Sequence, residues 1–466
     1  MKNENNHGAV LLVVLAAQVM MPIIGQSLTV ALPAMGKSLS VNPIVLGWIS
    51  ISLLLSIAVF AVPAGRIADM YGRKKIFLLG VVICTTTSFL LAASHSVASL
   101  IFYRAVQGIG GAMVLNTSIV IISSIYPTGR RGKMLGICLA ATYIGQTLAP
   151  ILGGFLTHYF GWRSIFLINV PLGLFIIGFT LWKIDAEWVG DPGQKFDIPG
   201  AIILGTMLVA IIYGLSAFPS KLGFLLLLTG LSLGVVFIKW ETKTAAPILD
   251  MNLFKKNRIF SISILTALIF YSAVFSAGFL LSLFMQYAKG FTPKTAGFIL
   301  VVQPVFQAAF SPLAGKFADR VKTQFLPIVG MVLTASGLFL FTLIEIETNM
   351  ASIFFGLFLI GCGWAFFVTT NMNDAMGTVD SHDYGNASGT IATIRQIGMM
   401  VSMALTMLIF SLYIGKSQVA PEQLDLFLKS VKTAFVCLTI LCLTGLLALA
   451  FRGKMKRAHY NFRKGQ

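Results

Sequence analysis

The sequence predicts an all-helical membrane protein with fourteen transmembrane helices, arranged as two six-helix bundles with an inserted pair between them. Of its 466 residues, 57% are hydrophobic and only 11% are charged, whereas soluble domains carry roughly 25% charged residues. The apolar residues form stretches of about 20, the length that crosses a bilayer as a helix. Short segments also recur about 250 residues apart. Together these observations predict the fold class.

The formal net charge is +18, from 34 Lys and Arg against 16 Asp and Glu. Nucleic-acid-binding proteins place such an excess on water-facing surfaces and are rarely this apolar, so we expect no nucleic-acid partner. The five cysteines stand singly in apolar stretches, with no CxxC pair, and the five histidines show no zinc-like spacing. We therefore expect no metal site and no cofactor.

Fourteen apolar stretches are long enough to span a membrane. They lie near residues 9–31, 43–64, 76–94, 98–125, 134–157, 164–183, 198–217, 221–239, 259–287, 294–314, 325–344, 350–371, 387–413 and 430–451.

The lysines and arginines predict the orientation, because cytoplasmic loops are enriched in both. With the amino terminus in the cytoplasm, 24 of the 34 cations lie inside and 8 outside, while Arg104 and Arg395 fall within spans. The carboxy-terminal tail, 452–466, contributes six of the inner cations. We therefore expect a multi-pass protein of the cytoplasmic (inner) membrane with both termini in the cytoplasm.

Two segments of the first half recur in the second. Residues 64–69, Ala-Gly-Arg-Ile-Ala-Asp, return as Ala-Gly-Lys-Phe-Ala-Asp at 314–319, and Gly132, Gly136 and Gly145 return as Gly385, Gly389 and Gly398. Parallel six-helix halves with a substrate site between them are a transporter architecture. The predicted domains are an amino-terminal bundle (1–183), a linker with inserted helices (184–258), a carboxy-terminal bundle (259–451) and the basic tail (452–466).

The segment 65–75 is the strongest local signal, and we expect it to be a loop. Asp69 stands at a helix end beside Arg66, Arg73, Lys74 and Lys75, which favour its ionised form. Gly65 and Gly72 permit a tight turn. We expect Asp69, held against these cations and a neighbouring helix terminus, to act as a latch, meaning an ionic contact that joins the two bundles in one state and releases them in another. Asp319 is the corresponding acid of the second half. The simpler alternative is a solvated loop that only sets topology.

Arg104 is expected well inside the fourth span, on one helical stripe with Gly108. A cation at membrane depth must face protein or water and is therefore a functional candidate. The structural alternative is an arginine that reaches the surface or ties backbone carbonyls together. In the fifth span, small residues recur every fourth position and let another helix approach closely; with the helix-loosening proline they form the expected hinge and packing face, Gly145, Ala149, Pro150, Gly153 and Gly154.

These elements, with Trp162-Arg163 through Pro171 before the sixth span, resemble the major facilitator superfamily, in particular its fourteen-helix branch of drug:proton antiporters. Residues 65–75 are similar to motif A, 104–112 to motif B and 136–154 to the antiporter motif C. The resemblance implies that Asp69 and Arg73 gate the cytoplasmic side and that Arg104 takes part in proton coupling. It implies no enzymatic activity.

The chain departs from that family in its acids. Family members usually carry a carboxylate in helix 1, and the matching position here is Ile24. Fifteen of the sixteen carboxylates map to tails, loops or span ends, and Asp374 is the borderline case, just beyond the twelfth span. Because no acid is expected near the membrane midplane, we expect a neutral or anionic amphipathic substrate rather than a cation. If protons drive transport, the candidate coupling residues are Asp69, Arg104 and Asp374. The expected cavity residues are Gln26, Gln146, Gln303, Gln307, Asn371 and Arg395.

The leading hypothesis is therefore a monomeric, proton-coupled exporter of drug-like amphiphiles that works by alternating access. The alternative is a flippase or facilitator for a lipid-like substrate without obligatory proton coupling, because buried arginines can also meet phosphate headgroups. A membrane-embedded enzyme is disfavoured, since no HExxH, GxSxG or nucleotide-binding loop is present. A channel is disfavoured because two related bundles with a latch suit a carrier.

Overall fold

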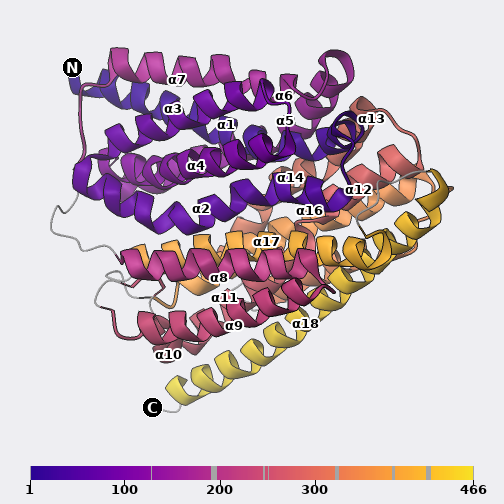
Figure 1. Ribbon diagram of the computed structural model, residues 1–466. Helices are drawn as coiled ribbons and strands as arrows, with labels where there is room; N and C mark the ends of the chain where they lie inside the picture. Colours follow the sequence, from indigo (N-terminus) through magenta and orange to yellow (C-terminus); the bar gives the residue numbers. More distant parts are fainter. Residues whose placement is uncertain are drawn as a thin grey trace. The chain divides into compact units, whose positions relative to one another are not determined.

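The computed structural model describes residues 2–126, 128–189, 197–244, 247–249, 251–320, 325–379, 384–415 and 421–464. Every regular element within these ranges is helical (Figure 1). Fourteen helical segments are long and apolar enough to cross a membrane, which confirms the predicted class. Backbone groups cannot remain unpaired in lipid, and helices satisfy them internally.

The first eight spans are formed by these elements: α1 (Lys2–Leu39), α2 (Pro43–Tyr71), α3 (Arg73–Ala92), α4 (Val97–Ile125), α5 (Thr128–Phe160), α6 (Ser164–Leu167) with α7 (Asn169–Lys183), α8 (Ile198–Ala217) and α9 (Lys221–Glu241). The short α10 (Met251–Lys256) precedes the last six, which are formed by α11 (Arg258–Val274) with α12 (Ala277–Leu283) and the π-helical η1 (Phe284–Ala288), α13 (Pro293–Leu300) with α14 (Val302–Arg320), α15 (Phe325–Thr342), α16 (Met350–Met376), α17 (Tyr384–Tyr413) and, after η3 (Pro421–Gln423), α18 (Leu424–Lys464).

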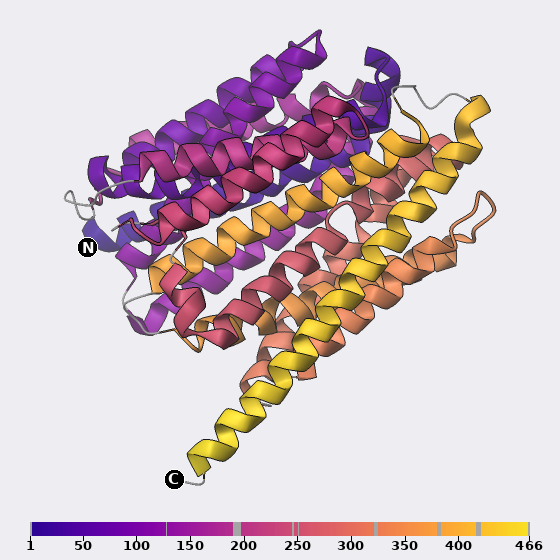
Figure 2. The same cartoon turned by 60° about the horizontal axis from the view of Figure 1, so that its bottom comes forward.

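Several helices extend beyond the apolar stretches that predict them. The second stretch is predicted to end at 64, but α2 continues to Tyr71, and α5 begins at Thr128 rather than near 134. Figure 2 shows α18 as one continuous helix that runs past its spanning part, Leu424–Ala450. Hydropathy marks where the bilayer ends, whereas intrahelical hydrogen bonds carry a helix on into the polar region.

The ninth span is interrupted in its middle. α11 ends at Val274 and α12 begins at Ala277. The backbone N–H of Ser276 donates to the hydroxyl of Ser402 on α17 at 3.0 Å, and the Ser402 hydroxyl donates to that of Ser276 at 2.9 Å. A side chain of a neighbouring helix therefore satisfies the backbone where the helix is broken.

The described residues fall into two compact units. One holds those of Met1–Leu208 and Met285–Val301, and the other holds most of the remainder, including α11, α12 and α14–α18. In the first unit α5 lies along α1, and both α2 and α3 lie along α4. A Cβ on Gly110 would stand 2.7 Å from the Gly80 carbonyl oxygen, so the backbones of α3 and α4 touch there. Such close approach is what holds helices together in a membrane.

In the second unit α11 packs against α17 and α18, and α16 packs against α14 and α15. The rings of Phe270 on α11 and Phe367 on α16 stack with centroids 4.1 Å apart. A Cβ on Gly330 of α15 would lie 2.4 Å from the backbone nitrogen of Phe367. Close approach at a glycine, as in the first unit, and stacked aromatic rings therefore both pack this unit.

Candidate functional site

The expected loop at residues 65–75 is almost entirely helical. Residues 65–71 form the last turns of α2, and Arg73 begins α3, so Gly72 alone separates the two helices. Gly72 has φ +113°, a conformation that residues with a Cβ rarely adopt. Its N–H donates to the Ala68 carbonyl at 3.0 Å, which caps α2. Gly65 has no neighbour within 4 Å of a Cβ built on it, so it permits no close approach in this structure.

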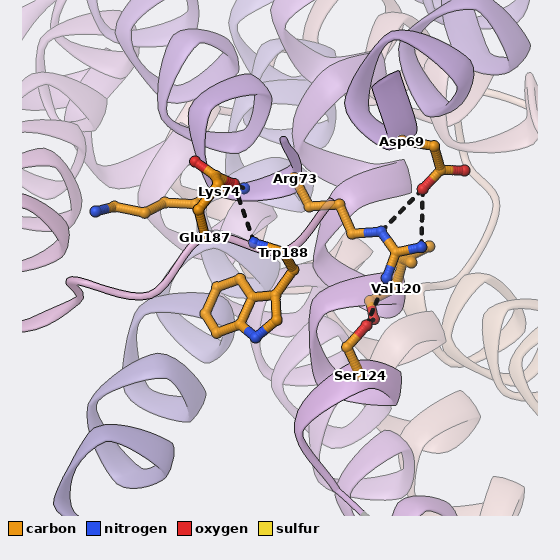
Figure 3. A network of polar contacts seen from close by, with 7 residues as sticks. All are labelled: Asp69, Arg73, Lys74, Val120, Ser124, Glu187 and Trp188. Carbon is orange, nitrogen blue, oxygen red and sulfur yellow. Dashed lines mark hydrogen bonds and ion pairs between the residues drawn. The ribbon is translucent and has the colours of Figure 1, made fainter. Parts of the chain in front are cut away.

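Asp69 and Arg73 form an ion pair across this junction (Figure 3). Arg73 Nη2 lies 2.8 Å from Asp69 Oδ1, and Arg73 Nε donates to the same oxygen at 2.9 Å. Arg73 Nη1 donates to the hydroxyl of Ser124, on the last turn of α4, at 2.6 Å. The guanidinium therefore joins the end of α2 to the end of α4. Both side chains of the pair retain some exposure, 26% for Asp69 and 18% for Arg73.

A third segment, which sequence reasoning missed, lies against this pair. Residues 184–189, here called the strap, follow α7. The Arg73 N–H donates to the Trp188 carbonyl at 2.8 Å, and the Lys74 N–H donates to Glu187 Oε1 at 2.8 Å. The Lys74 ammonium donates to the Ile184 carbonyl. A signal was present in the sequence: a helix that begins with three cations and no acid needs a negative group from elsewhere.

The end of α4 is fixed by a further contact. The Tyr126 hydroxyl donates to the His7 carbonyl at 3.3 Å, and the two rings are 5.7 Å apart. Burial, together with nearby Cys138, raises the pKa of Tyr126 above its usual value near 10. The hydroxyl therefore stays protonated at neutral pH and remains a donor.

The other two predicted gating acids belong to α14 and α16. The Asp319 side chain lies outside the described residues, although its backbone belongs to α14. Asp374 is half-buried in the last turn of α16. Their gating roles stay predictions.

Arg104 is 1% exposed and is held by three acceptors. Nη1 donates to the Ile24 carbonyl of α1 at 3.0 Å and to Gln107 Oε1 at 2.9 Å, while Nε donates to the Ile49 carbonyl of α2 at 3.4 Å. Gln107 in turn donates to the Ser88 hydroxyl of α3 at 2.9 Å. The guanidinium thus ties three helices together. One of its acceptors is the backbone oxygen of Ile24, the residue at the position where family members usually carry a carboxylate.

Gly108, one helical turn after Arg104, allows α4 to pack closely against α2. A Cβ on it would lie 2.4 Å from the Leu53 carbonyl, so α2 and α4 meet there without an intervening side chain.

Arg395 on α17 contrasts with Arg104. Its Nε is buried and has no hydrogen-bond partner among the described residues. Three more buried polar atoms without a partner, on Thr390, Thr393 and Gln396, lie on the same two turns of α17. Buried polar groups are normally paired, so such a concentration needs an explanation in water or a ligand.

The predicted packing face of α5 contacts two different segments. Cβ atoms built on Gly145 and Gly153 would lie 2.6 and 2.4 Å from the backbone oxygens of Val19 and Ser27, so both glycines face α1. Gly154 instead faces α13, where a Cβ on it would lie 2.5 Å from the Pro293 carbonyl.

The proline and alanine of this face complete the contact with α13. The carbonyl of Pro150 lies 2.3 Å from a Cβ built on Gly297, and Ala149 is fully buried. In sequence, α13 belongs to the second six-helix half, yet it lies in the same compact unit as α5.

The predicted cavity residues have mixed positions. Asn371 is buried and ties α16 to α11, since its Nδ2 donates to the Ser263 carbonyl at 2.9 Å. Gln307 is buried, and the remaining glutamines are half-buried on α1, α5 and α14: Gln26, Gln146 and Gln303. In the part of the chain that the structure describes, His, Cys, Asp and Glu form no group that could hold a metal ion.

Comparison with known proteins places the chain in a family. The family model of the Major Facilitator Superfamily matches residues 14–403. The chain is 30% identical over 382 residues to the multidrug resistance protein Stp of Mycobacterium tuberculosis (strain CDC 1551 / Oshkosh), covering 81% of this chain and 71% of that protein. It is 24% identical to the riboflavin transporter RibZ of Clostridioides difficile (strain 630), covering 95% and 96%.

Among solved structures, the fold is similar to that of a bacterial homologue of the human lysosomal transporter Spinster, crystallised in an inward-facing conformation. The TM-score is 0.69 at 15% identity, over 97% of both chains. Members of this family are transporters and not enzymes, as the sequence predicts. The chain belongs to the Major Facilitator Superfamily.

Proposed function

We propose that this protein exports drug-like amphipathic molecules by alternating access, driven by the inward movement of protons. The relationship to a multidrug resistance protein supports drug transport. The observation that carries the mechanism is the Asp69–Arg73 pair, because an ionic contact of partly exposed side chains can break and re-form. In this proposal it is the cytoplasmic latch, and Arg73 joins α2 to α4 only while the latch is closed.

The contacts of α13 support the alternating movement. Gly154 of α5 and Gly297 of α13 meet with no side chain between them. Nearby, Gln286 of η1 donates to the Val30 carbonyl of α1 at 2.9 Å. Surfaces of small residues and single hydrogen bonds can separate without exposing charge. We propose that these contacts form the outer gate and that the glycine face of α5 is where it opens.

Arg395 supports a preference for neutral or anionic substrates. A guanidinium with a buried, unpaired Nε offers a donor to a carboxylate, sulfonate or phosphate, and it repels a cation. In Arg104, by contrast, carbonyl and amide oxygens already accept from Nε and Nη1. We therefore propose that the substrate binds near Arg395 on α17. We place the proton-carrying step at Asp69, Arg104 or Asp374.

We further propose that the protein is a monomer in the cytoplasmic membrane with both termini in the cytoplasm. The excess of Lys and Arg in alternate loops supports this orientation. It puts the latch inside the cell and the contact of α5 with α13 outside. The predicted domain boundaries, at 183, 258 and 451, belong to the same proposal.

Purified protein in liposomes that contain a pH-sensitive dye tests the function. We would add an anionic, a neutral and a cationic fluorescent amphiphile: anilinonaphthalene sulfonate, Nile red and ethidium. We expect proton flux with the first two. Flux with ethidium alone would contradict the charge preference. Transport of the amphiphiles at a rate that does not depend on the pH gradient would contradict proton coupling and favour the facilitator for a lipid-like substrate.

A further inference from the structure

The amino terminus of α3 is a place where the local sequence opposes the helix. The helix begins with Arg73, Lys74 and Lys75, and its first turn contains no acid. Gly72, at the N-cap position, has no side chain to accept a hydrogen bond. The first turn of a helix carries free N–H groups and a partial positive charge, so three cations there are unfavourable. A partner must come from outside the helix.

Glu187 is that partner, and it comes from 113 residues further along the chain. Its Oε1 accepts the Lys74 N–H at 2.8 Å and also the Trp188 N–H at 3.2 Å (Figure 3). The carbonyl of Trp188 accepts the Arg73 N–H at 2.8 Å. The carboxylate thus caps α3 from a distance and, by binding its own neighbour's N–H, fixes the shape of the strap.

Gly72 makes this arrangement possible. A Cβ on Gly72 would lie 2.6 Å from Glu187 Cδ, so any other residue would displace the carboxylate. The glycine is therefore required both for its backbone conformation and for the space that Glu187 fills.

We propose that Glu187 is a positioning residue for the latch. The strap holds the backbone of Arg73, while Asp69 and Ser124 hold its guanidinium. Without Glu187 the first turn of α3 loosens and Arg73 no longer reaches both partners. The strap is the first part of the predicted linker, 184–258. It therefore also connects the latch, in sequence, to the inserted helices. This inference rests on the proposed role of the Asp69–Arg73 pair.

Hydrogen exchange tests the capping contact without any substrate. We would compare Glu187→Ala and Glu187→Gln with the control Asp185→Asn, an exposed carboxylate of the same strap. The amides of residues 74–76 should exchange about tenfold faster in the alanine variant and less than that in the glutamine variant, which keeps an acceptor. The control should match the wild type. Unchanged exchange in Glu187→Ala would overturn the proposal.

Transport of whichever of the three amphiphiles evokes proton flux tests the link to the latch. Glu187→Gln should lower the maximal rate about fivefold with KM unchanged, and Asp185→Asn should not. The charge-retaining variant Asp69→Glu should also slow transport. If Glu187 acts through Arg73, the double variant loses less than the product of the two single losses. Independent losses that multiply would contradict a positioning role.

The two proposals can fail separately. Wild-type transport by Asp69→Asn would show that the latch itself is wrong, and the positioning role would fall with it. Loss of transport in Asp69→Asn together with wild-type rates in Glu187→Gln would overturn the role of Glu187 alone.

Discussion

The two halves of the chain keep the same glycine contacts and differ in their charges. Gly145 of α5 and Gly398 of α17 correspond in the internal repeat, and each packs against the first helix of its own half. A Cβ on Gly145 would lie 2.6 Å from the Val19 oxygen of α1, and one on Gly398 would lie 2.9 Å from the Leu268 oxygen of α11. Gly136 and Gly389 also correspond, and neither has a neighbour within 4 Å.

The buried arginines show the difference. Arg104 has carbonyl and amide partners from three residues, whereas the buried Nε of Arg395 has no partner among the described residues. The halves therefore share their packing but differ in their buried arginines: the first holds one bound by three acceptors, beside the proposed latch, and the second holds one whose Nε has no partner among the described residues. Four predictions test this division, from the largest effect to the smallest.

Removal of Arg104 should have the largest effect on stability. Arg104→Ala leaves the Ile24 and Ile49 carbonyls and the Gln107 amide without their donor, and we expect a loss of about 3–5 kcal/mol. Arg395→Ala should cost less than about 1 kcal/mol, since no described contact is lost. Thermal unfolding in detergent, followed by tryptophan fluorescence, measures both. Equal losses would show that the two arginines have the same role.

The repeated glycines should respond in pairs. Gly145→Ala and Gly398→Ala insert a methyl group against backbone and should each cost about 1–3 kcal/mol. Gly136→Ala and Gly389→Ala meet open space within helices and should stabilise by about 0.5–1 kcal/mol. The same melting experiment reads all four variants. A sign that differs within either pair would contradict the structural repeat.

Arg395 should control substrate charge. Arg395→Gln should weaken binding of anilinonaphthalene sulfonate about tenfold, or roughly 1.4 kcal/mol, and leave Nile red unchanged. Fluorescence titration of the purified protein measures both affinities, and Arg395→Lys, which retains the charge, serves as the control. A parallel loss for the neutral probe would indicate a structural role instead.

Ser124 should have the smallest effect. Its hydroxyl supports Arg73 through one hydrogen bond of 2.6 Å. Ser124→Ala removes that bond but leaves the ion pair, so transport should slow only about twofold to fivefold, in line with roughly 0.5–1 kcal/mol. Initial rates in liposomes provide the measurement. A complete loss would mean that α4, rather than Asp69, is the main partner of Arg73.

Much of the fold could be predicted because hydropathy reports directly on the bilayer. All fourteen spans appear near their predicted positions. The interruption of the ninth span could not be predicted, because a distant hydroxyl on α17 stabilises it. The interruption of the tenth span at Val301 did have a local signal, since Pro304 follows three residues later and lacks a backbone N–H. The helical form of residues 65–71 was likewise hidden, since glycines and cations are also typical of loops.

The site could be predicted only where one short segment contains both partners. Asp69 and Arg73 are four residues apart, and the structure shows them as an ion pair, while their gating role stays a prediction. Glu187 could not be predicted as the partner of Lys74, nor the Ile24 carbonyl as the partner of Arg104, because each partner is far away in sequence. The sequence also could not predict that the Nε of Arg395 lacks a partner among the described residues, because the packing around a guanidinium determines which acceptors lie near it.

The most direct test of the central claim is the transport rate of Asp69→Asn in liposomes, with Asp319→Asn as the matched variant of the second half. Asp319 lacks a cation four residues on, where Thr323 stands. We predict that Asp69→Asn remains folded in the membrane and transports nothing, while Asp319→Asn retains at least part of the rate. Wild-type transport by Asp69→Asn would contradict the account.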